Sequence, residues 1–176
     1  GDAPLPFPVV FLPETGRDGA HCRGRRRPAP PKLFSEEKER GGRMENEWEM
    51  LIRRARAVLN PRSISPFVEA GGVAAAILTK SGAVYTGVCT DTACSLGMCA
   101  ERSAAANMIT NGEHRIAKLV CIMGDGKAGM PCGACRELLM QLSPENAEME
   151  ILQNCETFET IRLGALVPNW WGDGRV

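Results

Sequence analysis

The sequence lacks any apolar run approaching the roughly 20 residues that a membrane-spanning helix needs. Its first apolar stretch, residues 9–12, is also too short for the hydrophobic core of a secretory signal. There is no net charge either, because 21 Lys and Arg residues balance 21 Asp and Glu residues. These absences exclude helical membrane proteins and argue against a strongly basic nucleic-acid-binding chain. With eight cysteines and no export signal, we expect a reducing compartment, the cytoplasm, and neither a membrane nor a nucleic acid partner.

Proline and charge are unevenly distributed. Residues 1–43 hold seven of the twelve prolines and nine Lys and Arg residues against six Asp and Glu residues, without a sustained hydrophobic period. Such a composition cannot bury enough apolar surface to offset the entropy of ordering. We expect residues 1–43 to be a disordered Pro- and Arg-rich extension, either a solvated leader or a basic tail that binds polyanions. Residues 44–176 should form one compact domain that starts at Met44.

Hydrophobic periodicity after Met44 predicts alternating helices and strands. A helix over residues 48–59 should end at Asn60-Pro61, and a hairpin should follow, with strands 73–78 and 83–88 around the turn Ser81-Gly82. Further helices are expected over 99–109 and 132–142, strands over 119–123 and 149–152, and a short terminal helix over 160–166. The fold class is therefore α/β, a three-layer α/β/α sandwich with a mixed sheet.

The most informative pattern joins three cysteines and one glutamate. Cys99 is followed two residues later by Glu101, and Cys132 and Cys135 form a Cys-x-x-Cys pair after a proline. A lone Cys-x-x-Cys could be a redox pair, part of a disulfide set or two buried thiols. The full pattern favours a catalytic zinc ion, since three protein ligands leave the fourth tetrahedral position open to water. It matches the signature of zinc deaminases with a cysteine in place of the histidine.

Two segments carry a resemblance to a known family. Gly97 to Ala104 (Gly-Met-Cys-Ala-Glu-Arg-Ser-Ala) and Pro131 to Arg136 (Pro-Cys-Gly-Ala-Cys-Arg) resemble the metal motifs of the cytidine deaminases. The resemblance covers about residues 50–170 and implies the cytidine deaminase fold, with residues 44–176 as the catalytic domain. It also implies a Zn²⁺ cofactor, a role in pyrimidine salvage, and a homotetramer in which neighbouring subunits complete the pocket.

The activity implied by this resemblance is hydrolytic deamination of cytidine or deoxycytidine to the uridine product, with release of ammonia. Cys99, Cys132 and Cys135 would hold the zinc ion, and Glu101 would accept the proton of the attacking water and return it to the ring nitrogen and the leaving amine. If Cys99 and Cys132 lie at helix N-termini, the free N–H groups there lower their thiol pKa values.

Arginines follow both metal motifs. Arg102 and Arg136 could each donate hydrogen bonds to the ligand sulfurs and offset the negative charge of three thiolates, and we favour Arg102 for this role.

The positions expected to bind the substrate differ from the family pattern. When Gly87 is aligned, the family's Phe-Pro-Val-Gly-Ala falls on residues 71–75, and its Asn-x-Glu falls on Cys89-Thr90-Asp91. We expect Cys89, Asp91 and Ala100 to contact the substrate. Phe67 either refills the vacated aromatic position, if a Gly71-Gly72 loop folds back, or packs in the core. The remaining cysteines are expected to be structural.

Three alternatives remain open at this point. Residues 73–76, 86–88 and 166–171 also resemble the blasticidin S deaminase branch, which acts on a cytosine nucleoside analogue. In either branch, Trp170 and Trp171 would close the site or bury an interface. A polynucleotide deaminase would need a basic groove. A zinc-binding module without catalysis would keep the three cysteines and tolerate the loss of Glu101.

Overall fold

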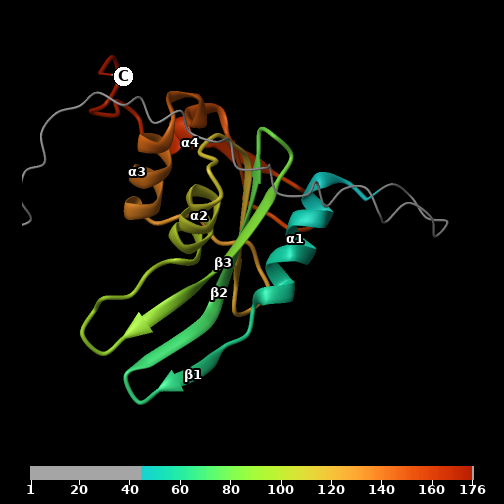
Figure 1. Cartoon of the computed structure of the whole chain (residues 1–176). Coiled ribbons are helices and arrows are strands. Elements are labelled where there is room, and N and C mark those ends of the chain that lie inside the picture. Colours follow the sequence, from blue (N-terminus) through green and yellow to red (C-terminus); the bar gives the residue numbers. More distant parts are fainter. Residues whose placement is uncertain (1–44, 176) are drawn as a thin grey trace, which may run out of the picture.

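The structure is a computed structural model of the chain, and it describes residues 45–175 (Figure 1). The expected extension, residues 1–43, lies outside the described residues. The helices are α1 (Glu47–Val58), α2 (Ala100–Thr110), α3 (Gly133–Leu142), the 3₁₀ helix η1 (Pro144–Glu148) and α4 (Leu163–Leu166). The strands are β1 (Arg62–Ser65), β2 (Val68–Thr79), β3 (Val84–Thr92), β4 (Ile116–Met123), β5 (Glu150–Leu152) and β6 (Thr160–Arg162). In this part of the chain, no helix is both long and apolar enough to cross a bilayer.

The sheet is organised around β2, which pairs antiparallel with β1, β3 and β4. Strand β4 then pairs parallel with β5, and β6 closes that edge antiparallel, so the sheet is mixed. Helix α1 covers one face, whereas α2 and α3 cover the other (Figure 1). Successive side chains of a strand point to opposite faces. Accordingly Ala76 and Leu78 pack with α1, while Ala75 and Ile77 pack on the α2 side. The expected three-layer fold is confirmed.

Helix α1 begins at a capping box. The Glu49 N–H donates to Asn46 Oδ1 (2.9 Å), and the Asn46 N–H donates to Glu49 Oε2 (3.0 Å). This pair satisfies two backbone donors that the first turn leaves free. The apolar face then buries Leu51 and Ala55 completely against the sheet. The helix ends before Asn60-Pro61, as the sequence predicts.

Helix α2 packs unusually close to β3, and Gly87 permits this approach. A Cβ atom at Gly87 would lie 2.2 Å from the Ala104 backbone nitrogen and 2.8 Å from the Ala100 carbonyl oxygen. Because no side chain separates the two elements, the first turns of α2 lie directly on the sheet. This contact fixes the height and direction of the helix that begins after Cys99.

A fully buried amide joins three elements at the other end of the domain. Asn146 Oδ1 accepts the N–H of Ile116 (2.8 Å), and its Nδ2 donates to the carbonyls of His114 (3.0 Å) and Leu139 (3.0 Å). Its side chain therefore ties η1 to the start of β4 and the end of α3. Each bond satisfies a backbone group that would be costly to bury unpaired.

Strand β1 and the outer parts of β2 and β3 form an arm that extends beyond the helices (Figure 1). The end of the arm exposes 57% of Ile64, 70% of Phe67 and 79% of Leu96. Both expectations for Phe67 are therefore wrong: it lies neither in the core nor in the pocket described below. Gly71 and Gly72 do not form a loop that folds back, because they continue β2 through an irregular stretch between Ala70 and Ala74.

The predicted terminal helix over residues 160–166 is correct only in its last four residues. Residues Thr160–Arg162 form β6, which pairs with β5 through Ile151 and Ile161. A three-residue strand carries too little periodicity to be separated from a helical turn. The sequence analysis also does not predict β1 or η1, which are only four and five residues long.

Candidate active site

Three cysteine sulfurs meet where α2 and α3 begin. Cys99 is the N-cap residue of α2, Cys132 is the N-cap residue of α3, and Cys135 lies in the first turn of α3. The Sγ atoms of Cys99 and Cys132 are 3.5 Å apart, as are those of Cys132 and Cys135. All three lie within 4.8 Å of one another. Sulfurs bound tetrahedrally to zinc at about 2.3 Å would be about 3.8 Å apart, so this donor set fits a zinc ion.

The surroundings shift the thiol pKa values of Cys132 and Cys135 in opposite directions. Burial raises the pKa of Cys132, but hydrogen bonds from the backbone N–H groups of Cys135 and Ala134 and from neighbouring thiols bring it below its ordinary value. The pKa of Cys135 is raised, by burial first and by the charge of Glu101 second. A cation bound among the sulfurs would lower the pKa of Cys135 and so oppose the effect of Glu101, because a cation favours the thiolate form.

Glu101 lies in the first turn of α2 and is only 4% exposed. Burial raises its pKa, although hydrogen bonds with its own backbone N–H, Cys135 and Cys121 oppose the shift. A carboxyl group with a raised pKa gains and loses a proton more readily near neutral pH. Glu101 is thus beside the cysteine cluster and suited to proton transfer.

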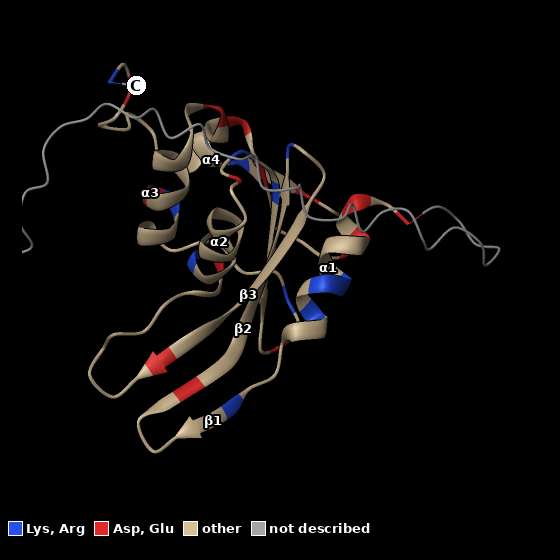
Figure 2. Ribbon diagram, viewed as in Figure 1, with Lys and Arg blue, Asp and Glu red and all other residues tan. Residues whose placement is uncertain are grey.

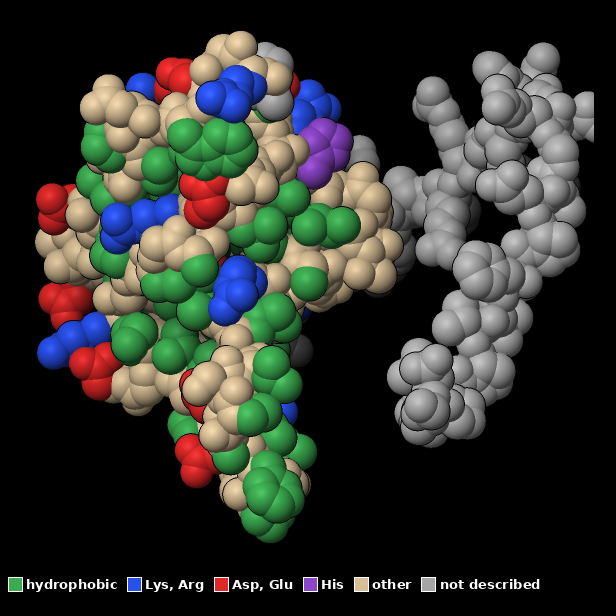
Figure 3. Space-filling model, turned by 90° about the vertical axis from the view of Figure 1, so that its left-hand side faces the viewer, with side chains coloured by type: hydrophobic (Ala, Val, Ile, Leu, Met, Phe, Trp, Pro, Cys, Tyr) green, Lys and Arg blue, Asp and Glu red, His purple; other side chains and the backbone are tan. Residues whose placement is uncertain are grey.

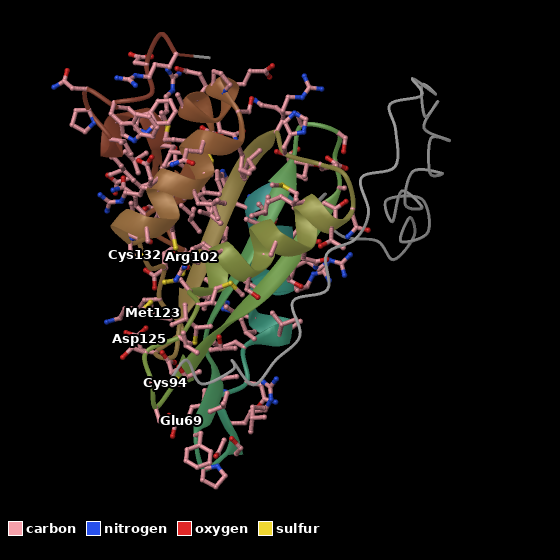
Figure 4. All side chains as sticks on the ribbon, turned by 60° about the vertical axis from the view of Figure 1, so that its left-hand side comes forward. Glu69, Cys94, Arg102, Met123, Asp125 and Cys132 are labelled. Atoms are coloured by element: carbon pink, nitrogen blue, oxygen red, sulfur yellow. The ribbon has the colours of Figure 1, made fainter. Side chains whose placement is uncertain are left out.

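Arg102 lies beside the cysteine cluster and has a buried donor. Its Nε has no hydrogen-bond partner among the described residues, and its Nη2 donates weakly to the Gly97 carbonyl (3.5 Å). A hydrogen bond with Cys99 raises the pKa of Arg102. By contrast, Arg136 donates to the Pro131 carbonyl (2.8 Å). Arg102, which interacts with Cys99 and Cys135, is therefore the arginine placed to bond with ligand thiolates, and Figure 4 shows it in the same region as Cys132.

A pocket of about 520 Å³ opens in front of Glu101 and the cysteine cluster. All three residues expected to contact the substrate, Cys89, Asp91 and Ala100, line it. The lining also includes residues that sequence reasoning missed or assigned otherwise: Val73, Thr90, Thr92, Ser95, Gly97, Met98, Cys121, Met123 and Met130. Neither a basic nor an aromatic side chain is among the fifteen residues that line it.

Cys89 links the pocket to a bulge in the sheet. Its sulfur accepts the N–H of Val73 (3.2 Å), and its thiol donates to Asp91 Oδ2 (3.8 Å). Asp91 also lines a second pocket of about 260 Å³, which includes Glu69. Glu69 and Asp91 are directly paired across β2 and β3, and Figure 2 shows acidic positions on both strands of the arm.

The C-terminal tryptophans, Trp170 and Trp171, are hydrogen-bonded to α3. Glu137 accepts the indole N–H of Trp170 (3.0 Å) through Oε2 and that of Trp171 (2.7 Å) through Oε1. Trp170 packs against the core, whereas Trp171 is 60% exposed. Neither ring lines the pocket within this chain.

Comparison with known proteins agrees with this geometry. The sequence profile of the cytidine and deoxycytidylate deaminase zinc-binding region matches residues 51–151, more than half of the chain. The chain belongs to this family. As a family member it is a zinc-dependent hydrolase of C–N bonds, and its cofactor is Zn²⁺. The matched range contains both metal motifs and every residue proposed for the site.

Individual relatives of this deaminase come from several bacteria. The cytidine deaminase of Mycobacterium tuberculosis is 34% identical over 101 residues, which is 57% of this chain and 72% of the relative. The crystal structure of the enzyme from that organism matches with a TM-score of 0.59 at 30% identity and covers 72% of this chain and 98% of its own. The cytidine deaminase structure from Mycobacterium leprae matches with a TM-score of 0.58 at 28% identity, over 70% of this chain and 99% of its own.

Proposed function

We propose that this deaminase converts the cytosine base of a free nucleoside, cytidine or deoxycytidine, to uracil with release of ammonia. The observation that carries the proposal is that Cys99, Cys132 and Glu101 line one pocket, with the buried Cys135 sulfur within 4.8 Å of the other two sulfurs. Zinc bound there supplies a Lewis acid that activates water. The buried carboxylate of Glu101 takes the proton from the attacking water and gives it to the ring nitrogen and then to the leaving amine.

The composition of the pocket supports a nucleoside rather than a nucleotide or a polynucleotide. Among residues 45–175, those that line the pocket include Asp91 and Glu101 but no Lys or Arg. A phosphate group would therefore meet carboxylates without a cation to bind it. A nucleic acid partner would need the basic face that this pocket lacks.

A second candidate substrate is a cytosine nucleoside analogue with an additional substituent, of the blasticidin S type. The second pocket gives room for such a substituent beyond the sugar, since it shares Asp91 with the first pocket. Glu69 and Asp91 would favour a substituent with positive charge.

We also propose that the enzyme acts in pyrimidine salvage in the cytoplasm and assembles as a homotetramer. The exposed apolar end of the arm supports self-association, because Ile64, Phe67 and Leu96 form a hydrophobic surface of the kind that subunit contacts bury. Figure 3 shows hydrophobic side chains gathered at this end of the molecule. Light scattering after gel filtration measures the assembly, and Phe67→Ser should weaken it.

Residues 44–176 are proposed to be the catalytic domain. Removal of residues 1–43 should leave turnover and melting temperature nearly unchanged, because their composition offers no core-forming pattern. A large loss of either would assign a function to the extension.

The deciding experiment is ammonia release from a panel of cytidine, deoxycytidine, cytosine, cytidine monophosphate and blasticidin S. We expect turnover to be fastest with one of the two nucleosides and to depend on Glu101. X-ray absorption should find about three sulfurs at about 2.3 Å and one lighter ligand per zinc. Four sulfurs and no turnover would instead support a structural zinc module.

A further inference from the structure

Two methionines at the pocket have larger exposed fractions than the other methionines of residues 45–175. Met123 is 42% exposed and Met130 is 38% exposed, and both line the pocket in front of the cysteine cluster. Methionines elsewhere in the described chain are at most 8% exposed and belong to the core, apart from the half-buried Met98, which also lines the pocket. Figure 4 shows Met123 on the same side of the molecule as Cys132. Exposed methionine is therefore a property of the pocket.

The backbone holds Met123 in place through a tight turn after β4. Its N–H donates to the Lys127 carbonyl (2.9 Å), and the Gly129 N–H donates to the Cys121 carbonyl (2.9 Å). These bonds fold residues 127–129 back along the end of β4. A Cβ atom at Gly129 would lie 2.6 Å from Met123 Sδ and 3.0 Å from its Cγ. The thioether thus occupies the space that the glycine leaves open.

Met130 extends the same wall toward the metal ligands. It follows Gly129 directly and stands two residues before Cys132, so its main chain is fixed by the turn on one side and by α3 on the other. Both thioethers consequently line the pocket that leads to Glu101 and the zinc-ligand cysteines Cys99 and Cys132.

The pocket needs a surface for the flat face of a base, and none of the residues 45–175 of this chain that line it is aromatic. Thioether sulfurs make favourable contacts with aromatic rings, and the flexible methionine side chain adapts to their shape. Binding a ring there would also remove apolar surface from water. We propose that Met123 and Met130 form the wall on which the pyrimidine ring of the substrate packs, so that these two side chains help to determine which substrates bind. This inference rests on the proposed function.

Methionine methyl NMR tests the contact without turnover. The zinc-loaded full chain, labelled with ¹³C at methionine methyl groups, is titrated with uridine, the expected product. The Met123 and Met130 signals, assigned with the Met123→Leu and Met130→Leu variants, should shift on titration, because the bound ring and its carbonyl groups replace water around their methyl groups. The signals of Met108 and Met149, which are buried in the core, should stay in place and serve as internal controls.

Kinetics provide a second test. Met123→Ala and Met130→Ala should each raise KM for the preferred nucleoside about tenfold and leave kcat within about twofold, as expected for lost apolar binding. The two Leu variants keep apolar area but lose the thioether, so they should raise KM less than the Ala variants do. Gly129→Ala should also raise KM, because its methyl group would displace the Met123 thioether. Ile109→Ala is the matched control, since Ile109 is 45% exposed on α2 but lies outside the pocket.

Unchanged KM in both Ala variants, or uridine binding without movement of either methionine signal, would overturn this inference and leave the proposed function intact. Met123 and Met130 signals that move when the subunits dissociate on dilution, but not when uridine is added, would also overturn it. A second copy of the chain would then cover these two side chains. If the parent chain deaminates no cytosine compound, the proposed function fails and the inference fails with it.

Discussion

Replacing Gly87 with alanine should separate α2 from the sheet and damage the metal site from a distance. The added methyl group would lie 2.2 Å from the Ala104 nitrogen, whereas ordinary contact begins at 3.4 Å, so the helix must retreat by about 1.2 Å. Backbone atoms of a packed helix cannot rotate away as a flexible side chain can. Overpacking of this kind costs about 1–3 kcal/mol, which should lower Tm by about 3–12 °C in a chain of this size.

The consequence for the site follows from which residues move. Cys99 and Glu101 move with α2, whereas Cys132 and Cys135 stay with α3. Zinc sites tolerate changes of only about 0.2 Å in ligand distance, so Gly87→Ala should lose most of its zinc and its activity.

The assays are metal content after gel filtration and thermal unfolding with and without added zinc. Ala106→Ser is the control. Like Gly87→Ala it adds one heavy atom, but residue 106 lies on the exposed side of α2, so this variant should behave like the parent. If Gly87→Ala keeps its zinc, turnover and Tm, then the close packing described for Gly87 does not position the site.

Other predictions concern the site and the C-terminal segment. Glu101→Gln should retain zinc and lose about 10²- to 10⁴-fold in turnover, because an amide cannot accept the proton; normal turnover would remove Glu101 from the mechanism. Cys132→Ser should lose zinc as well as activity, as measured by metal analysis, because a hydroxyl is a poor ligand for zinc compared with thiolate. A chelator should lower Tm of the parent, since zinc binds only the folded arrangement; an unchanged Tm would mean that zinc adds no stability. Glu137→Ala should shift the tryptophan fluorescence to longer wavelength without changing zinc content, because the carboxylate that accepts the indole N–H groups of Trp170 (3.0 Å) and Trp171 (2.7 Å) is lost.

The cysteine cluster was predictable from the sequence because its geometry is local. Cys132 and Cys135 are one helical turn apart, and Cys99 starts a helix as Cys132 does, so helix geometry alone brings the sulfurs to the ends of two helices.

The pocket wall was not predictable, because it depends on strand pairing. Cys121 is interpreted from sequence as a structural cysteine, and it is indeed 2% exposed, yet the pairing of β4 with β2 turns it toward Glu101. Met123 is equally ambiguous, since the side of the sheet that it faces is set by register. The error at Phe67 has the same origin: β2 continues through Gly71, and nothing local reveals that the arm extends beyond the helices.

The buried amide of Asn146 has an evolutionary consequence. Its single acceptor and two donors match three backbone groups, from Ile116 at the start of β4, from His114 two residues before that strand, and from Leu139 in α3. Aspartate has the same shape but would place a carboxylate against two carbonyl oxygens, and alanine would leave all three groups without partners. No single substitution preserves this set of bonds. We therefore expect asparagine at this position to persist across divergent relatives, even where the residues that contact the substrate have changed.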